Sequence, residues 1–163
     1  MPQLPERIWK RRLESEYEEM KAKAESDKSF SFTVNAEKTI YLITINAAAY
    51  KKGTRGEMER VGRHQVEIRL SREYPYAGGI YLLWKTPIFH PNIRASDGMV
   101  CIRMINNWSE SQTIANIVDA IRQVLENPNP DDPLDEEAAK YFKERGMGKR
   151  RESSRRGGPR VVA

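Results

Sequence analysis

Apolar residues recur along the first part of the chain with the spacing of an α-helix. Between Pro5 and Glu25 they stand mostly three or four positions apart, which places them on one face of a helix. The residues on this face are Ile8, Leu13, Tyr17, Met20 and Ala24. We therefore predict an amphipathic N-terminal helix over residues 5–25, with its charged side chains in solvent.

From Phe30 the hydrophobic pattern changes to one that is typical of β-strands. Four stretches alternate apolar and polar residues or are rich in β-branched ones, at 30–34, 39–45, 64–70 and 80–84. A loop is predicted between the second and third stretches, at Gly53, Gly56 and Gly62, and a turn before the fourth at 74–79. Because the connections are short, we expect an antiparallel meander.

Residues 86–108 show no regular period, and an irregular stretch of this length inside a compact domain usually serves a function. Behind it, the capping-box pattern at 109–112 predicts the start of a helix. The apolar face of this helix carries Ile114, Ile117, Val118, Ile121, Val124 and Leu125. The helix ends at the proline-rich run 127–133, and a short helix follows over 134–145. Segregated helices and an antiparallel sheet predict an α+β fold.

The positive charge of the chain is concentrated at its end. The 163 residues hold 28 Lys and Arg against 23 Asp and Glu, but seven of the basic residues and only one acidic residue follow position 144. We therefore predict one nearly neutral domain over 1–145 and a basic, flexible tail over 146–163. Nucleic acid is expected to bind only through this tail. The longest apolar run, Ile80–Trp84, is too short to cross a membrane, so neither membrane contact nor a signal peptide is expected.

A single cysteine, Cys101, lies in the irregular stretch, and the chain has two histidines, His64 and His90. One thiol cannot form an internal disulfide, which fits a reducing, cytoplasmic compartment. These residues are too few for a structural zinc site, so we expect no metal. Cys101 is then either buried packing or a reactive thiol. A cysteine hydrolase would need His90 as its base, but a histidine before a proline in a tight turn more often holds the turn.

Several motifs occur in an order that resembles the ubiquitin-conjugating enzymes, the E2 family. They are Tyr74-Pro75-Tyr76, Thr86-Pro87-Ile88-Phe89-His90-Pro91-Asn92-Ile93, Gly98-Met99-Val100-Cys101-Ile102, Trp108-Ser109 and Asn127-Pro128-Asn129-Pro130-Asp131-Asp132-Pro133-Leu134. The resemblance runs from the N-terminal helix to about Tyr141. It implies the UBC fold and an enzyme that accepts ubiquitin or a ubiquitin-like modifier from an activating enzyme and passes it to substrate lysines.

The resemblance also implies roles for individual residues. Cys101 would carry the modifier as a thioester. Asn92 would donate to the oxyanion that forms when lysine attacks, or would only brace the loop. Asp132 would orient and deprotonate the lysine, or would cap the following helix. The residues that would structure the loop are His90, Pro91, Tyr74 and Trp108. The protein would need no cofactor, because the activating enzyme uses the ATP.

The same resemblance assigns surfaces to partners. The activating enzyme would meet the basic face of the first helix, at Arg7, Lys10 and Arg11. A RING-type ligase or the modifier would contact Tyr76, Ser109, Glu110, Ser111 and Asp119, although Asp119 fits a solvated helix position equally well. At 77–79 and 110–111 the chain lacks prolines that the family usually has, so the sequence identifies neither the ligase nor the modifier. Two other interpretations stay open: an inactive modifier-binding scaffold of the same fold, and a nucleic-acid-binding protein acting through its tail.

Overall fold

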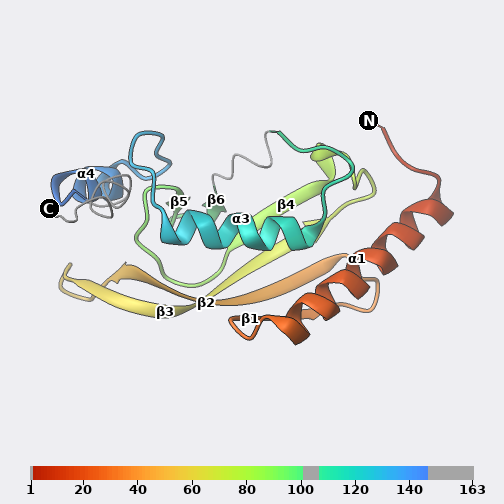
Figure 1. Ribbon diagram of the computed structural model, residues 1–163. Helices are drawn as coiled ribbons and strands as arrows, with labels where there is room; N and C mark the ends of the chain where they lie inside the picture. The colour runs from red at the N-terminus through yellow and green to blue at the C-terminus, as the bar shows by residue number, and fades with distance from the viewer. Residues whose placement is uncertain (1, 101–106, 147–163) are drawn as a thin grey trace, which may run out of the picture.

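The computed structural model describes residues 2–100 and 107–146; Cys101 and the tail beyond 146 lie outside the described residues. In chain order the elements are α1 (Glu6–Ser26), β1 (Phe30–Val34), β2 (Ile40–Lys52), β3 (Met58–Leu70), the 3₁₀ turn η1 (Ala77–Gly79), β4 (Ile80–Trp84), β5 (Ile93–Arg94), β6 (Met99–Val100), α3 (Ile114–Glu126) and α4 (Glu136–Glu144). Figure 1 shows α3 lying across one face of the sheet, with α1 and α4 toward opposite ends of the molecule. The predicted α+β class and the predicted order of helices and main strands are confirmed.

Strands β1 to β4 form one antiparallel sheet in chain order, which confirms the expected meander. Along β2 the residues Tyr41, Ile43 and Ile45 are buried, whereas the residues between them are not. Ile43 lies opposite Val66 of β3, where Val66 and Ile68 are buried in the same alternation. Because successive side chains of a strand point to opposite faces, these residues form one apolar face, which α3 covers.

The hairpin of β2 and β3 is longer than the sequence predicts. The expected loop is only a short turn at 53–57, and Gly62 lies inside β3. The pairing register shifts once, between Asn46 and Ala49, where β2 has one residue more than β3. Such a β-bulge interrupts the ladder locally and then lets pairing resume. The three alanines at 47–49 show no alternation, so the hydrophobic pattern did not reveal the outer half of the hairpin.

The helix α3 begins later than its predicted capping box. Residues 109–112 form a turn, in which the amide of Gln112 donates to the carbonyl of Ser109 at 3.0 Å. The N-cap is Thr113: its side chain accepts from the amide of Asn116, and the side chain of Asn116 accepts from the amide of Thr113. The box is therefore present, with asparagine at the position where the sequence rule expects Glu or Gln.

The buried face of α1 contains one charged residue that the apolar pattern does not indicate. Glu16 is 1% exposed, whereas Ile8, which was predicted to lie on this face, is 43% exposed. The Glu16 carboxylate accepts hydrogen bonds from the Tyr74 hydroxyl, from Arg12 Nε at 2.8 Å and from the backbone amide of Ile114 at 2.9 Å. Burial of a carboxylate is costly unless it is paired and hydrogen-bonded, as it is here.

These bonds join α1 to two segments that are distant in sequence. One is the turn at 74–76, and the other is the first turn of α3. The Ile114 amide is one of the N–H groups that the start of a helix leaves without a partner inside the helix. Glu16 supplies the acceptor from another helix, and its negative charge also suits the positive end of the α3 dipole.

Replacing Glu16 by alanine should lower the free energy of unfolding by about 2–4 kcal/mol, because three donors would lose their acceptor at once. Urea unfolding would measure the loss. Glu18→Ala is the matched control on the same helix: Glu18 is 63% exposed and pairs with Lys21 at only 3.9 Å. Its removal should cost less than about 0.5 kcal/mol. Equal losses in the two variants would contradict the structural role of Glu16.

Candidate active site

His90 connects the predicted active-site stretch to the last turn of α3. It is 1% exposed; its Nδ1 accepts from the amide of Asn92 at 3.0 Å, and its Nε2 donates to the carbonyl of Val124 at 2.8 Å. Burial lowers the pKa of His90 to about 4, so the imidazole is neutral at pH 7. Because both ring nitrogens are bonded to backbone groups, neither remains to take a proton from a thiol. The geometry supports a loop-structuring role and gives the cysteine-hydrolase interpretation no support.

Asn92 braces the loop between α3 and α4. Its side-chain nitrogen donates to the carbonyls of Asn129 and Asp132 at 3.0 and 3.1 Å, and its side-chain oxygen accepts from the amide of Asn129 at 2.8 Å. The residue is only 5% exposed. Both hydrogens of the amide are therefore used in bracing. Donation to an oxyanion would require one of these bonds to be exchanged.

The same loop carries Asp132 and leads into α4. The carbonyl of Pro91 accepts from the amide of Asp135 at 3.1 Å, which fixes the end of the loop. Asp135 is also the N-cap of α4, since its carboxylate accepts from the amide of Ala138 at 3.0 Å. The alternative in which Asp132 caps this helix is therefore wrong. Asp132 is exposed, and its proposed action on a lysine stays a prediction.

The chain approaches Cys101 through a small hairpin, where the sequence predicted irregular structure. Strands β5 and β6 pair with each other, and the Gly98 carbonyl accepts from the amide of Trp84 on β4 at 2.8 Å. Gly98 has a φ of +80°, and a Cβ atom there would lie 2.6 Å from the Trp84 carbonyl oxygen. Only glycine accommodates this conformation and this contact without strain. The backbone at Gly98, three residues before Cys101 in the sequence, is thus hydrogen-bonded to β4.

Tyr74 and Trp108 join two surface stretches that the resemblance assigns to a ligase or modifier. Tyr74 is fully buried, Trp108 Nε1 donates to the carbonyl of Pro75, and the Tyr74 and Trp108 rings lie 6.2 Å apart. Tyr76 follows Pro75, and the exposed residues 109–111 follow Trp108. The structure therefore brings Tyr76 and the stretch 109–111 to one place on the surface.

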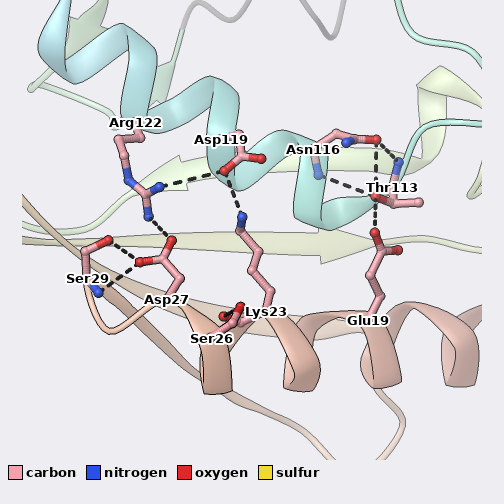
Figure 2. A network of polar contacts seen from close by, with 9 residues as sticks. All are labelled: Glu19, Lys23, Ser26, Asp27, Ser29, Thr113, Asn116, Asp119 and Arg122. Carbon is pink, nitrogen blue, oxygen red and sulfur yellow. Dashed lines mark hydrogen bonds and ion pairs between the residues drawn. The ribbon is translucent and has the colours of Figure 1, made fainter.

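Asp119 lies in a row of polar contacts between α1 and α3, which Figure 2 shows from close by. The Lys23 ammonium lies 2.8 Å from the Asp119 carboxylate, and Arg122 lies 2.9 Å from Asp27. Hydrogen bonds from Ser29, assisted by Arg122, lower the pKa of Asp27 to about 2. A modifier that contacted Asp119 would therefore have to share its carboxylate with Lys23.

The basic residues Arg7, Lys10 and Arg11 are all exposed on the first turns of α1. Lys10 lies 3.1 Å from Glu6, an exposed pair one turn away that contributes little to stability. Arg12 differs from these three, because it turns inward to the buried Glu16. The structure thus leaves a basic surface at the start of α1 that can meet an acidic partner.

Within residues 2–100 and 107–146, no three His, Cys, Asp or Glu side chains are grouped as a bound metal ion would require. Over the same ranges, no helix has the length and hydropathy needed to cross a membrane.

Acid should destabilise the fold through His90. Its pKa is about 4 in the folded chain and about 6.5 in the unfolded chain, so the unfolded state takes up the proton first as the pH falls. From pH 7 to 4.5 this residue alone should lower the free energy of unfolding by about 2 kcal/mol. His90→Gln, which cannot titrate, should lose correspondingly less in urea unfolding over that range. An NMR titration that finds the folded imidazole protonated at pH 6 would contradict this expectation.

Comparisons with known proteins identify the family. A family model described as ubiquitin-conjugating enzyme matches residues 12–155. Ubiquitin conjugating enzyme E2 B of Dictyostelium discoideum is 34% identical over 106 residues, which are 63% of this chain and 71% of that protein. A protein of Acanthamoeba polyphaga mimivirus with the name "Probable ubiquitin-conjugating enzyme E2 L460" is 30% identical over 139 residues, which are 82% of each chain. The solved E2 domain of a Toxoplasma gondii ubiquitin conjugating enzyme has a TM-score of 0.63 and 27% identity, over 82% of this chain and 85% of that one. This chain therefore belongs to the ubiquitin-conjugating enzyme family.

Proposed function

We propose that this chain accepts ubiquitin, or a ubiquitin-like modifier, as a thioester on Cys101 and transfers it to a substrate lysine. The observation that carries the proposal is the set of bonds between Asn92 and the loop 129–132. Ile93, next to Asn92, pairs with Val100, next to Cys101. The structure thus holds the segments of Asn92 and Asp132 together, and it pairs Val100, the residue before Cys101 in the sequence, with Ile93.

The proposed reaction has two acyl transfers. First, the Cys101 thiolate attacks the thioester carbonyl on the activating enzyme; a new C–S bond forms, the C–S bond to the activating enzyme's cysteine breaks, and that cysteine leaves as a thiolate. Second, the neutral amine of lysine attacks the thioester on Cys101, a C–N bond forms and the Cys101 thiolate leaves. Sulfur suits this carrier role because it is a good nucleophile whose acyl ester stays reactive toward amines.

Asn92 and Asp132 act in the second transfer. The developing oxyanion needs a hydrogen-bond donor, and Asn92 can supply one by exchanging a bond that its amide makes to a loop carbonyl. Asp132, whose backbone carbonyl is bonded to Asn92, orients the amine and accepts the proton that it loses. The bracing bonds of Asn92 support this assignment, because they keep the two residues next to each other.

The partners follow from the proposed reaction. The activating enzyme docks on the basic surface of α1, at Arg7, Lys10 and Arg11, and consumes the ATP, so this chain needs no cofactor of its own. A RING-type ligase contacts Tyr76 and the stretch 109–111. The protein acts in the reducing cytoplasm, where the thiol of Cys101 stays available. The basic tail over 146–163 adds a salt-sensitive attraction to acidic partners, nucleic acid among them.

Incubation with activating enzyme, ubiquitin and ATP should produce an adduct that a reducing agent removes. Because Cys101 is the only cysteine in the chain, such an adduct locates the thioester without further mapping. Cys101→Ser should give an adduct that resists reduction, since an oxygen ester forms instead, and Cys101→Ala should give none. The proposal would be refuted by an adduct that persists in Cys101→Ala. It would also be refuted by a folded wild-type chain that forms a thioester with none of the modifiers supplied.

Asn92→Ala should still form the thioester but should discharge to lysine about 10²-fold more slowly, the scale of a missing oxyanion donor. Single-turnover discharge of the pre-formed thioester measures this step alone. Asn127→Ala is the matched control, because it truncates an exposed asparagine at the C-terminal end of α3, outside the loop 129–132. Wild-type discharge by a folded Asn92→Ala variant would leave Asn92 with its bracing role only.

A further inference from the structure

A second, smaller cluster of apolar side chains lies beside the candidate site, separate from the main core. Phe89, Ala138 and Phe142 are its buried members, and the residues that pack against them are Tyr50, Met58 and Tyr141. They come from three places: the outer half of the β2–β3 hairpin, the segment just before His90, and α4. The outer half of the hairpin was not predicted from the sequence. Through this cluster it packs against the segments on both sides of the site.

The hairpin end holds the segment that leads into His90. The carbonyl of Tyr50 accepts from the amide of Phe89 at 2.8 Å, and Phe89 immediately precedes His90. The Lys52 ammonium lies 5.1 Å from the centre of the Phe89 ring, within the range of a cation–π contact. One end of the tripeptide 90–92 is thus fixed to β2.

The same hairpin end also holds α4. The rings of Tyr50 and Phe142 meet edge to face, with centroids 6.4 Å apart. Lys52 forms an ion pair with Glu137 in the first turn of α4. Because α4 begins only four residues after Asp132, the packing of α4 against the hairpin determines the position at which the loop 129–132 ends.

We propose that the outer end of the hairpin, through Tyr50, is a positioning element for Asp132 in transfer to lysine. The two segments that meet at Asn92 are the tripeptide and the loop. The backbone carbonyl of Tyr50 holds the residue before the tripeptide, and the Tyr50 ring holds α4, the helix that follows the loop. Loss of the ring contact loosens α4 on the hairpin and displaces Asp132 relative to the attacking amine. Thiol exchange on Cys101 uses no group of this loop, so charging is unaffected. The inference rests on the proposed function, since it concerns the second transfer.

Tyr50→Ala should slow single-turnover discharge to lysine by about fivefold, mainly through a higher half-saturating lysine concentration, because small misplacements of a catalytic group are costly. Charging by the activating enzyme should change by less than about twofold. Tyr50→Phe, which keeps the ring contact, should restore discharge. Tyr81→Ala is the matched control: it truncates a tyrosine that is 57% exposed on β4, outside the cluster, and should leave both steps unchanged.

A double-mutant cycle separates positioning from general loosening of the fold. In an Asp132→Ala background, Tyr50→Ala should add little further loss, because Tyr50 acts through Asp132. The same fivefold loss in both backgrounds, or equal losses in charging and discharge, would overturn the inference. If Tyr50→Ala fails to fold, Lys52→Ala, which removes the ion pair with Glu137 and the cation–π contact with Phe89, carries the same cycle with a loss of about twofold. A wild-type chain that never charges refutes the proposed function itself, whereas normal charging with a background-independent loss refutes this inference alone.

Discussion

The buried carboxylate of Glu16 connects segments of the chain that no local pattern brings together. It holds the Tyr74 turn and the first amide of α3 to α1, and Arg12 adds a bond to the carbonyl of Gln112 at 2.7 Å. The other end of α3 meets the candidate site, because the carbonyl of Val124 accepts from His90. The helix α3 therefore connects Glu16, at its first turn, to the tripeptide 90–92, at its last turn.

Hydrogen bonds between side chains and backbone groups dominate at the C-terminal end of α3. His90, Asn92 and Asp135 each bind backbone groups of segments that are distant or adjacent in sequence. Buried polar groups of this kind stabilise one arrangement only when all their partners are present. The His90-Pro91-Asn92 tripeptide is consequently a structural frame for the loop 129–132, in addition to any part it has in the chemistry. The tripeptide and the loop also share an anchor on the hairpin end, so the second cluster extends that frame.

The sequence predicts the elements whose periods are regular. It locates α1, β1, β4 and the end of α3 closely, because their apolar residues recur without interruption. It misses the outer half of the β2–β3 hairpin, where a bulge and three alanines at 47–49 remove the alternation. It also misses Glu16, although a signal exists: Glu16 lies three residues after Leu13 and four before Met20, both buried on the same helix face.

The candidate site is less accessible to sequence reasoning than the fold. The bonds from Asn92 to Asn129 and Asp132 span 37 and 40 residues, and no spacing rule relates such positions. The motifs identify the two segments in the sequence, but only the structure shows the hydrogen bonds between them and the helix cap at Asp135. The predicted capping box lies four residues early, because 109–112 satisfies the sequence rule completely, whereas the box that forms has asparagine, Asn116, in place of Glu or Gln.

Hydrogen exchange of individual amides in the wild-type chain and in Glu16→Gln measures the connection through Glu16 most directly. The substitution keeps the shape of the side chain but removes the charge that Arg12 and the start of α3 require. If Glu16 holds these segments together, amides in the first turns of α3 and at 74–76 should exchange about tenfold faster or more, while the hairpin end near Tyr50 keeps its protection. Faster exchange confined to α1, with α3 and the turn unchanged, would contradict the account.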